Sequence, residues 1–129
     1  MKLLKIALIT IIPHLLFAQQ EDPWNYVTPV YGVSTAAISV LNLSLNITNG
    51  VQMDRKEGHN GVPVLGILSG IGQITIGAFN LPEEQQIFDQ SYINQRQKNV
   101  SIFNIGFGSV TVLLSTINLV VNSNKPKKS

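Results

Sequence analysis

Residues 35–49 read TAAISVLNLSLNITN, and a stripe of small or polar residues runs through this stretch at alternating steps of four and three. The same steps recur in residues 66–80 and in residues 104–118. A period of about 3.5 residues places such positions on one narrow face of an α-helix. These positions, which we call the seam, are Thr35, Ser39, Asn42, Asn46, Asn49, Gly66, Gly70, Gln73, Gly77, Asn80, Asn104, Gly108, Thr111, Ser115 and Asn118.

The residues between the seam positions are mostly Val, Ile, Leu, Phe and Ala. A soluble amphipathic helix has the opposite arrangement, with a narrow apolar face and a broad polar face. The pattern therefore predicts an all-α fold, a small helical membrane protein whose three transmembrane helices pack through the seam. The predicted spans cover about residues 30–49, 62–80 and 101–122.

The distribution of charge also indicates a membrane protein. Charged residues are 12% of the chain, about half of the roughly 25% found in an average globular domain. None of them lies in residues 23–53, 58–82 or 99–124. Each of these runs is longer than the ~20 residues that a helix needs to cross a bilayer.

The net charge of +2 comes mainly from lysines close to the two ends of the chain. Because no basic face is formed, we expect no binding to nucleic acid. The chain has no cysteine, which excludes disulfide bonds and thiolate metal sites. Its 129 residues are enough for one domain.

The N-terminal residues have the features of an export signal. Two lysines among the first five residues precede a largely apolar run that ends at Phe17, and Ala18 is followed by a polar stretch. This order resembles a bacterial signal peptide with its cleavage site. We expect a signal peptide over residues 1–18 and a single three-span domain over residues 19–129, with an uncleaved fourth span as the alternative.

Residues 41–48 carry a competing signal for a β-strand. Leu and Ile alternate there with Asn, Ser and Thr, and Asn49-Gly50 follows, which is typical of a hairpin turn. The alternative is a strand of a small outer-membrane barrel. However, the other two seam segments do not alternate in this way, and all three share the helical steps. We therefore predict a helix that ends at Asn49-Gly50.

Two polar connections join the predicted spans. Residues 51–61 contain Asp54, Glu57 and His59, but a glycine-rich loop offers no dry pocket for acid–base or metal chemistry. We predict a solvated loop.

Residues 81–99 are predicted to be helical, because Pro82 and two glutamates suit a helix start and Arg96 and Lys98 suit a last turn. The seam steps also continue backward from Asn104 through Ser101 and Gln97. Helix three is therefore expected to begin near Pro82, or to follow a helix that lies flat on the membrane.

The positive residues and the aromatic residues predict how the chain lies in the membrane. Arg55, Lys56 and the lysines of residues 125–128 fall on one side, and only Arg96 and Lys98 fall on the other. The positive-inside rule then predicts a bacterial inner-membrane protein with a periplasmic mature N-terminus and a cytoplasmic C-terminus.

Aromatic side chains gather where the first span begins. Trp24, Tyr26 and Tyr31 lie within eight residues of one another, and such rings favour the headgroup boundary. We expect these three side chains to mark the membrane surface.

No catalytic motif was found among phosphate loops, paired metal-binding histidines or nucleophile elbows. We therefore expect no enzyme activity, no catalytic residue, no cofactor and no metal site. The expected role is structural or interactive, with the lipid bilayer and either a second copy or another membrane protein as partners through the seam. A small pore or transporter lined by Asn, Gln, Ser, Thr and Gly is the alternative, although the seam lacks the charged residues of most ion pathways.

Overall fold

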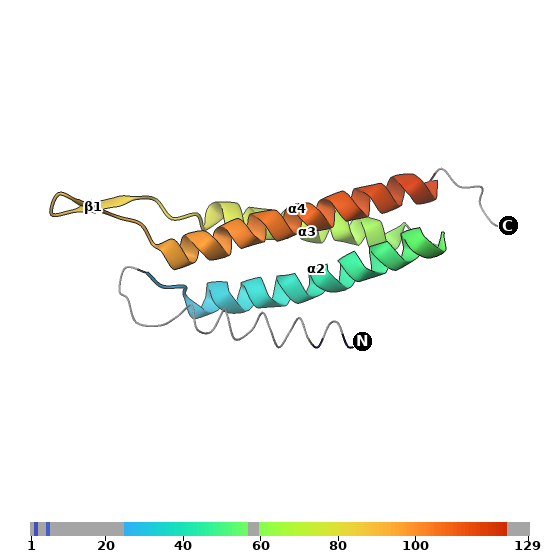
Figure 1. Cartoon of the computed structure of the whole chain (residues 1–129), viewed down its shortest axis with the longest axis horizontal. Helices are drawn as coiled ribbons and strands as arrows, with labels where there is room; N and C mark the ends of the chain where they lie inside the picture. Colours follow the sequence, from blue (N-terminus) through green and yellow to red (C-terminus); the bar gives the residue numbers. More distant parts are fainter. Residues whose placement is uncertain (1, 3–4, 6–24, 57–59, 124–129) are drawn as a thin grey trace.

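The computed structural model describes residues 2, 5, 25–56 and 60–123. Three long helices lie side by side along the long axis of the molecule, and a short hairpin extends from one end (Figure 1). The described elements are α2 (Pro29–Arg55), α3 (Gly61–Phe79), β1 (Gln85–Ile87), β2 (Gln90–Tyr92) and α4 (Gln95–Ser123).

Each of the three helices is long and apolar enough to span a membrane, so the predicted fold class is confirmed. Helix α3 has 19 residues, which corresponds to about 29 Å and matches the hydrocarbon thickness of a bilayer. Helices α2 and α4 have 27 and 29 residues and are longer by about 12–15 Å. The predicted signal peptide lies outside the described residues, apart from Lys2 and Lys5.

Helices α2 and α4 run parallel, and α3 runs antiparallel to both (Figure 1). Asn104 donates to Thr35, and Asn118 donates to Asn49; the residues of each pair are 69 positions apart. The same offset relates every seam position of α2 to a seam position of α4 in the sequence. The repeat therefore corresponds to the register in which the two parallel helices pack.

The prediction that the first helix ends at Asn49-Gly50 is wrong. Helix α2 continues to Arg55 and is capped by Lys56, whose φ of 54° is left-handed and whose N–H bonds to two carbonyls of the last turn. The Asn49 amide bonds to the Leu45 carbonyl of its own helix, so it supports the helix instead of forming a turn. Helical backbone hydrogen bonds are also hard to replace in lipid. The β-strand alternative for residues 41–48 is excluded by the same helix.

The prediction that residues 81–99 are helical is wrong for residues 81–94. Strands β1 and β2 pair antiparallel there, with Ile87 opposite Gln90. The helix starts only at Gln95 because the Asn94 side chain accepts a hydrogen bond from the Gln97 N–H, which is the geometry of an N-cap. Arg96 therefore lies in the first turn of α4, not in the last turn of a separate helix.

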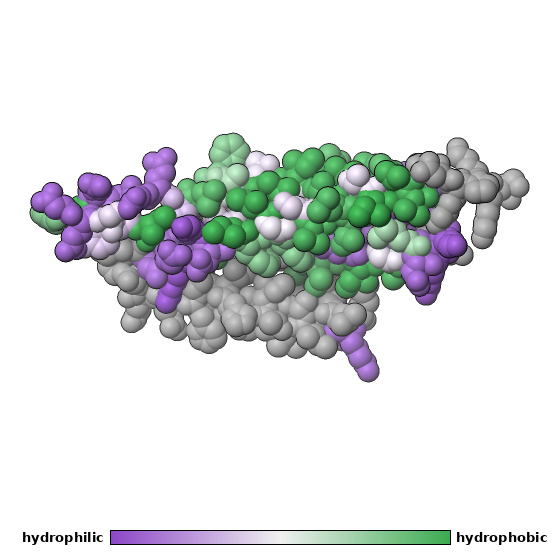
Figure 2. All heavy atoms as spheres, turned by 45° about the horizontal axis from the view of Figure 1, so that its top comes forward, coloured by the Kyte–Doolittle hydropathy of each residue, from purple (hydrophilic) through white to green (hydrophobic). Residues whose placement is uncertain are grey.

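The interior of the bundle is polar and its exterior is apolar. Within the described part of the chain, few hydrophobic side chains are buried, among them Val27 and Leu45, whereas ten polar residues are completely buried. Large apolar side chains such as Leu68 and Leu113 are exposed to more than 60%. Apolar residues cover the middle of the helices, and hydrophilic residues gather toward the two ends (Figure 2). This is the arrangement expected when lipid surrounds the helices.

Candidate functional site

The helices bury the seam against one another. Asn46 and Asn80 are half-buried, and all other seam residues are buried. The seam positions of all three helices therefore meet in one interface, and the hydrogen bonds of their side chains determine what this interface can do.

Gln73 of α3 links all three helices. Its Nε2 donates to Ser39 Oγ of α2 at 2.9 Å and to Asn104 Oδ1 of α4 at 3.0 Å. Its Oε1 accepts from Asn42 Nδ2 of α2 at 2.6 Å. A fully buried amide thus has both of its polar atoms satisfied by side chains of the neighbouring helices.

This network continues toward the hairpin end of the bundle. Asn104 Nδ2 donates to Thr35 Oγ1 at 2.9 Å and to the Tyr31 hydroxyl at 3.0 Å. The hydroxyls of Tyr31 and Ser101 lie 2.8 Å apart, and Ser101 Oγ donates to the Asn80 carbonyl at 3.0 Å. The buried hydrogen bonds therefore run without a break from Asn42 to the end of α3.

One member of this network, Tyr31, differs from its sequence interpretation, and another, Ser101, agrees with it. Tyr31 was expected at the membrane surface, but its ring is buried and its hydroxyl belongs to the network. A further step of four backward from Thr35 leads to Tyr31, so the seam spacing itself contained this signal. Ser101 lies on the backward extension of the stripe and is fully buried. Tyr26 is exposed, and Trp24 lies outside the described residues.

A second network joins α2 and α4 at the opposite end of the bundle. Asn118 Nδ2 donates to Asn49 Oδ1 at 2.7 Å and to Gln52 Oε1 at 2.9 Å. Asn49 Nδ2 donates to Ser115 Oγ at 3.0 Å. Gln52 lies beyond the predicted end of the first span, so this part of the site was missed from the sequence.

Glycines bring α3 and α4 into direct backbone contact. A Cβ atom added to Gly70 would lie 2.8 Å from the Gly108 carbonyl oxygen, and one added to Gly108 would lie 2.6 Å from the Gly70 oxygen. A Cβ atom on Gly77 would lie 2.6 Å from the Ser101 oxygen. Small residues permit this approach in lipid, where dispersion contacts replace the hydrophobic effect in holding helices together.

The side chains of some seam residues do not bond across the interface. Thr111 Oγ1 donates to the Phe107 carbonyl of its own helix at 3.1 Å, and Asn80 Nδ2 donates to the Ile76 carbonyl at 2.7 Å. Asn46 Oδ1 is buried without a hydrogen-bond partner. These side chains fill space without linking helices.

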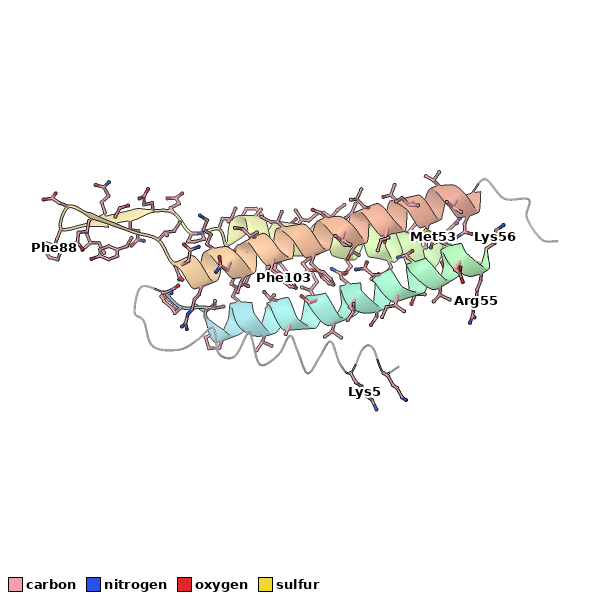
Figure 3. All side chains as sticks on the ribbon, viewed as in Figure 1. Lys5, Met53, Arg55, Lys56, Phe88 and Phe103 are labelled. Atoms are coloured by element: carbon pink, nitrogen blue, oxygen red, sulfur yellow. The ribbon has the colours of Figure 1, made fainter. Side chains whose placement is uncertain are left out.

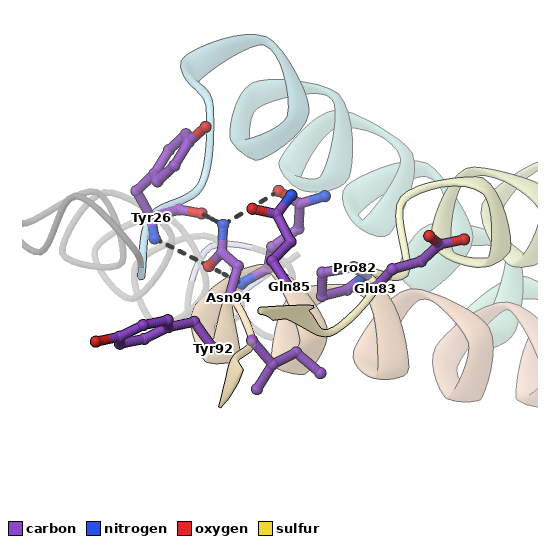
Figure 4. A pocket seen from close by; sticks show the side chains of 8 residues that line it. Tyr26, Pro82, Glu83, Gln85, Tyr92 and Asn94 are labelled. Carbon is purple, nitrogen blue, oxygen red and sulfur yellow. Dashed lines mark hydrogen bonds between the residues drawn. The ribbon is translucent and has the colours of Figure 1, made fainter. Parts of the chain in front are cut away.

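A third set of contacts holds the hairpin at the end of the bundle. The Asn94 side chain accepts from the Tyr26 N–H at 2.9 Å and donates to the Tyr26 carbonyl at 2.6 Å (Figure 4). Gln97 Nε2 donates to the Asn80 carbonyl at 2.8 Å. The chain before α2, the end of α3 and the start of α4 are therefore tied together at the root of the hairpin. A cavity of about 280 Å³ lies at this root, lined by Tyr26, Pro82, Glu83, Gln85, Tyr92, Ile93, Asn94 and Gln97.

The chemistry of the seam is limited to neutral hydrogen bonding. Its side chains are amides and hydroxyls, which carry no charge and transfer no proton at ordinary pH. In the part of the chain that the structure describes, no group of three or more His, Cys, Asp or Glu could hold a metal ion. The seam can therefore hold helices together. Most of its buried polar atoms are bonded within this chain, and Asn42 Oδ1 and Asn46 Oδ1 are the described seam atoms that are buried without a partner.

Comparisons of the chain with protein-family models, with curated proteins and with solved structures found no match. The function is therefore inferred from the geometry of the bundle and the hairpin.

Proposed function

We propose that this chain is a small integral membrane protein with a structural or interaction role, which holds the β1–β2 hairpin outside the bilayer as a docking element for another protein. The observation that carries the proposal is that the chain's own helices bury the seam. A partner was expected to dock through the seam, but most of the polar atoms there are already bonded within the chain. The hairpin, in contrast, is polar and most of its residues are exposed to solvent.

The hydrogen bonds at the hairpin root support this role. Asn94 binds both backbone polar groups of Tyr26, and Gln97 binds the end of α3. A docking element that is held in place loses less conformational freedom when it binds than a free loop does. The bundle then acts as a membrane-embedded base that fixes the position of the hairpin.

We further propose that the protein lies in a bacterial inner membrane, with the hairpin on the periplasmic side. Arg55 and Lys56 lie at the opposite end of the bundle from the hairpin, and the positive-inside rule places them in the cytoplasm. Single cysteines at Gln90 and Asn60 test this orientation, because the chain has no cysteine of its own. An impermeant thiol reagent should label Gln90→Cys in intact spheroplasts and should leave Asn60→Cys unlabelled. The reverse labelling would contradict the orientation.

Catalysis is not part of the proposal. The buried groups of the seam are neutral amides and hydroxyls, which are weak acids and bases and are held by their hydrogen bonds. The pore alternative has no specific support either, because Gln73, Asn104 and Ser115 have no exposed surface.

The docking role is tested by the size of the protein extracted in mild detergent. We expect the wild-type chain to migrate in native electrophoresis as a complex larger than the monomer. A variant in which residues 84–93 are replaced by a Gly-Ser segment of equal length should migrate as a monomer. Its helical content and thermal unfolding should match those of the wild type, which serves as the control for folding. A wild-type monomer, or a complex that survives the replacement, would contradict the docking role.

A further inference from the structure

The tip of the hairpin has an unusual backbone. Phe88 and Asp89 form the two-residue loop between β1 and β2, and both have positive φ, 52° and 63°. Such a loop needs left-handed residues at both positions, which is why Asn-Gly is favoured there. A bulky aromatic residue in this conformation is rare. Strained positions of this kind cluster at binding and active sites, so the backbone of the tip suggests that it has a function.

The side chain at this tip is apolar and open to solvent. Phe88 is 94% exposed and lies at the free end of the hairpin, beyond the ends of the helices (Figure 3). It therefore contributes almost nothing to packing within the chain. An aromatic ring held in this way can enter a pocket on another molecule without first leaving contacts of its own.

The charged residues between α3 and α4 are all acidic: Asp89 lies beside Phe88, and Glu83 and Glu84 lie nearer the root of the hairpin. Glu83, Glu84 and Asp89 are exposed, and the sequence has no lysine or arginine between Lys56 and Arg96. Partner surfaces are usually complementary in charge. A surface that accepts Phe88 should therefore be positive around an apolar centre.

We propose, on the basis of the docking role above, that Phe88 is an anchor residue that inserts into an apolar pocket with a basic rim on a partner protein. Aromatic side chains buried in a partner's pocket contribute most of the binding energy in many interfaces. Asp89 beside the ring, together with Glu83 and Glu84 nearer the root, orients the hairpin toward the rim of lysines and arginines and speeds the encounter. A protein is favoured over a lipid surface because anionic headgroups repel the carboxylates. Two copies meeting tip to tip would likewise bring carboxylates together.

One contact across the hairpin and one within β2 keep the tip in one shape. Glu84 accepts a hydrogen bond from the Ser91 hydroxyl on the opposite side of the hairpin, and the Tyr92 hydroxyl donates to Gln90 Oε1 at 2.5 Å. Together with the contacts at the root, they hold Phe88 in the orientation in which it meets the partner.

A photo-crosslinking amino acid, p-benzoylphenylalanine, tests the anchor when it replaces Phe88 in cells. We expect irradiation to give one protein adduct of discrete mass, whose crosslinked peptide has apolar residues beside lysine or arginine. The same amino acid in place of Gln86, an exposed residue of β1, should give at least fivefold less adduct. Combining the photo-crosslinker with Glu83→Lys and Asp89→Lys should reduce the adduct at least fivefold, and Glu83→Gln with Asp89→Asn should reduce it less.

The remaining outcomes overturn the proposal in different ways. No adduct, or an adduct with lipid only, would show that Phe88 does not anchor a protein. An adduct whose yield does not change on charge reversal would show that the partner has no basic rim. If the complex in detergent still depends on the hairpin, the docking role itself would stand. The lipid alternative is tested directly with Phe88→Trp in a Trp24→Phe background. We expect no blue shift of the fluorescence with vesicles of phosphatidylcholine and phosphatidylglycerol, and a shift would favour membrane insertion over a protein pocket.

Discussion

Gln73 shows how a single amide can organise a membrane bundle. It bonds to Ser39 and Asn42 on α2 and to Asn104 on α4, so no two helices can rotate against each other without breaking one of its hydrogen bonds. In water such bonds would compete with solvent, but lipid offers no alternative partner. The residue therefore fixes the rotation of three helices at one depth.

Substitution of Gln73 by leucine should destabilise the bundle by about 2 kcal/mol. Interhelical hydrogen bonds in membranes average about 0.6 kcal/mol each, and Gln73 takes part in three of them. The free energy of unfolding can be measured by titration with sodium dodecyl sulfate, followed by circular dichroism. Thr75→Val on the same helix is the control, because Thr75 is exposed and bonds only to the Ile71 carbonyl. A loss for Gln73→Leu no larger than that of the control would show that the network adds no stability.

Ser69→Ala should leave the stability unchanged or raise it by up to about 1 kcal/mol. The Ser69 hydroxyl is buried without a hydrogen-bond partner, and a buried unsatisfied group costs free energy that its removal recovers. Ser115→Ala provides the contrast, because Ser115 Oγ accepts from Asn49 and its loss leaves that amide with one bond fewer. The same detergent titration distinguishes them. A clear loss of stability in Ser69→Ala would mean that the hydroxyl has a partner in the membrane.

At the scale of elements, α3 and α4 form the tightest pair. Gly70 and Gly108 place the two backbones in contact, and no side chain could be added at either position without a shift. Helix α2 instead joins the pair largely through the longer amide and hydroxyl side chains. The bundle therefore combines a close-packed pair with a third helix held mainly by hydrogen bonds.

Gly108→Ala should lower the free energy of unfolding by about 1–3 kcal/mol, the usual cost of overpacking a tight contact. Gly106→Ala on the same helix is the matched control, because a Cβ atom there meets nothing within 4 Å. Alanine is the better helix former, so the control should be neutral or more stable by up to about 1 kcal/mol. Equal effects of the two substitutions on detergent-induced unfolding would contradict the close approach of α3 and α4.

The helices could be predicted from the sequence, but the hairpin could not. The seam spacing and the charge-free runs each occur three times along the chain. Both identify a helix even when its exact ends are placed a few residues wrongly. The hairpin has only three residues in each strand, and its loop is Phe88-Asp89 in place of a glycine-containing turn. Neither feature stands out from the polar residues around it, while Pro82 and its acidic neighbours favoured a helix.

The hydrogen-bond partners of individual seam residues could not be predicted from the sequence either. The spacing identified which residues face inward, but it did not state that Gln73 bonds to both neighbours or that α2 and α4 share a register. Those contacts depend on how far each helix is rotated and how closely the glycines let α3 and α4 approach. Both are properties of the packed bundle, not of any one segment.

At the scale of the whole molecule, the exterior is apolar where lipid surrounds it and the interior is polar but closed. Cysteines at Gln73 and Ser115 in the seam, and at Ile74 and Leu114 beside it, test this arrangement. We expect all four to be unreactive toward small charged thiol reagents in membranes, because a closed interface admits no water path. Gln90→Cys on the exposed hairpin is the positive control. Selective reaction of the Gln73 and Ser115 variants would instead indicate a pore.

The register between α2 and α4 also sets the delay between the synthesis of a residue and the synthesis of its hydrogen-bond partner. Asn104 and its partner Thr35 are 69 residues apart, and synthesis proceeds at about 5–20 residues per second. Thr35 and Asn49 of α2 are therefore made roughly 3–14 s before Asn104 and Asn118 of α4, which bind them. Ser44 and Thr48 need no partner on another helix, because they donate to carbonyls of their own helix. Asn42, however, donates only to groups on α3. Asn42 must therefore be sheltered from lipid, or held beside the translocation machinery, until α3 has been made.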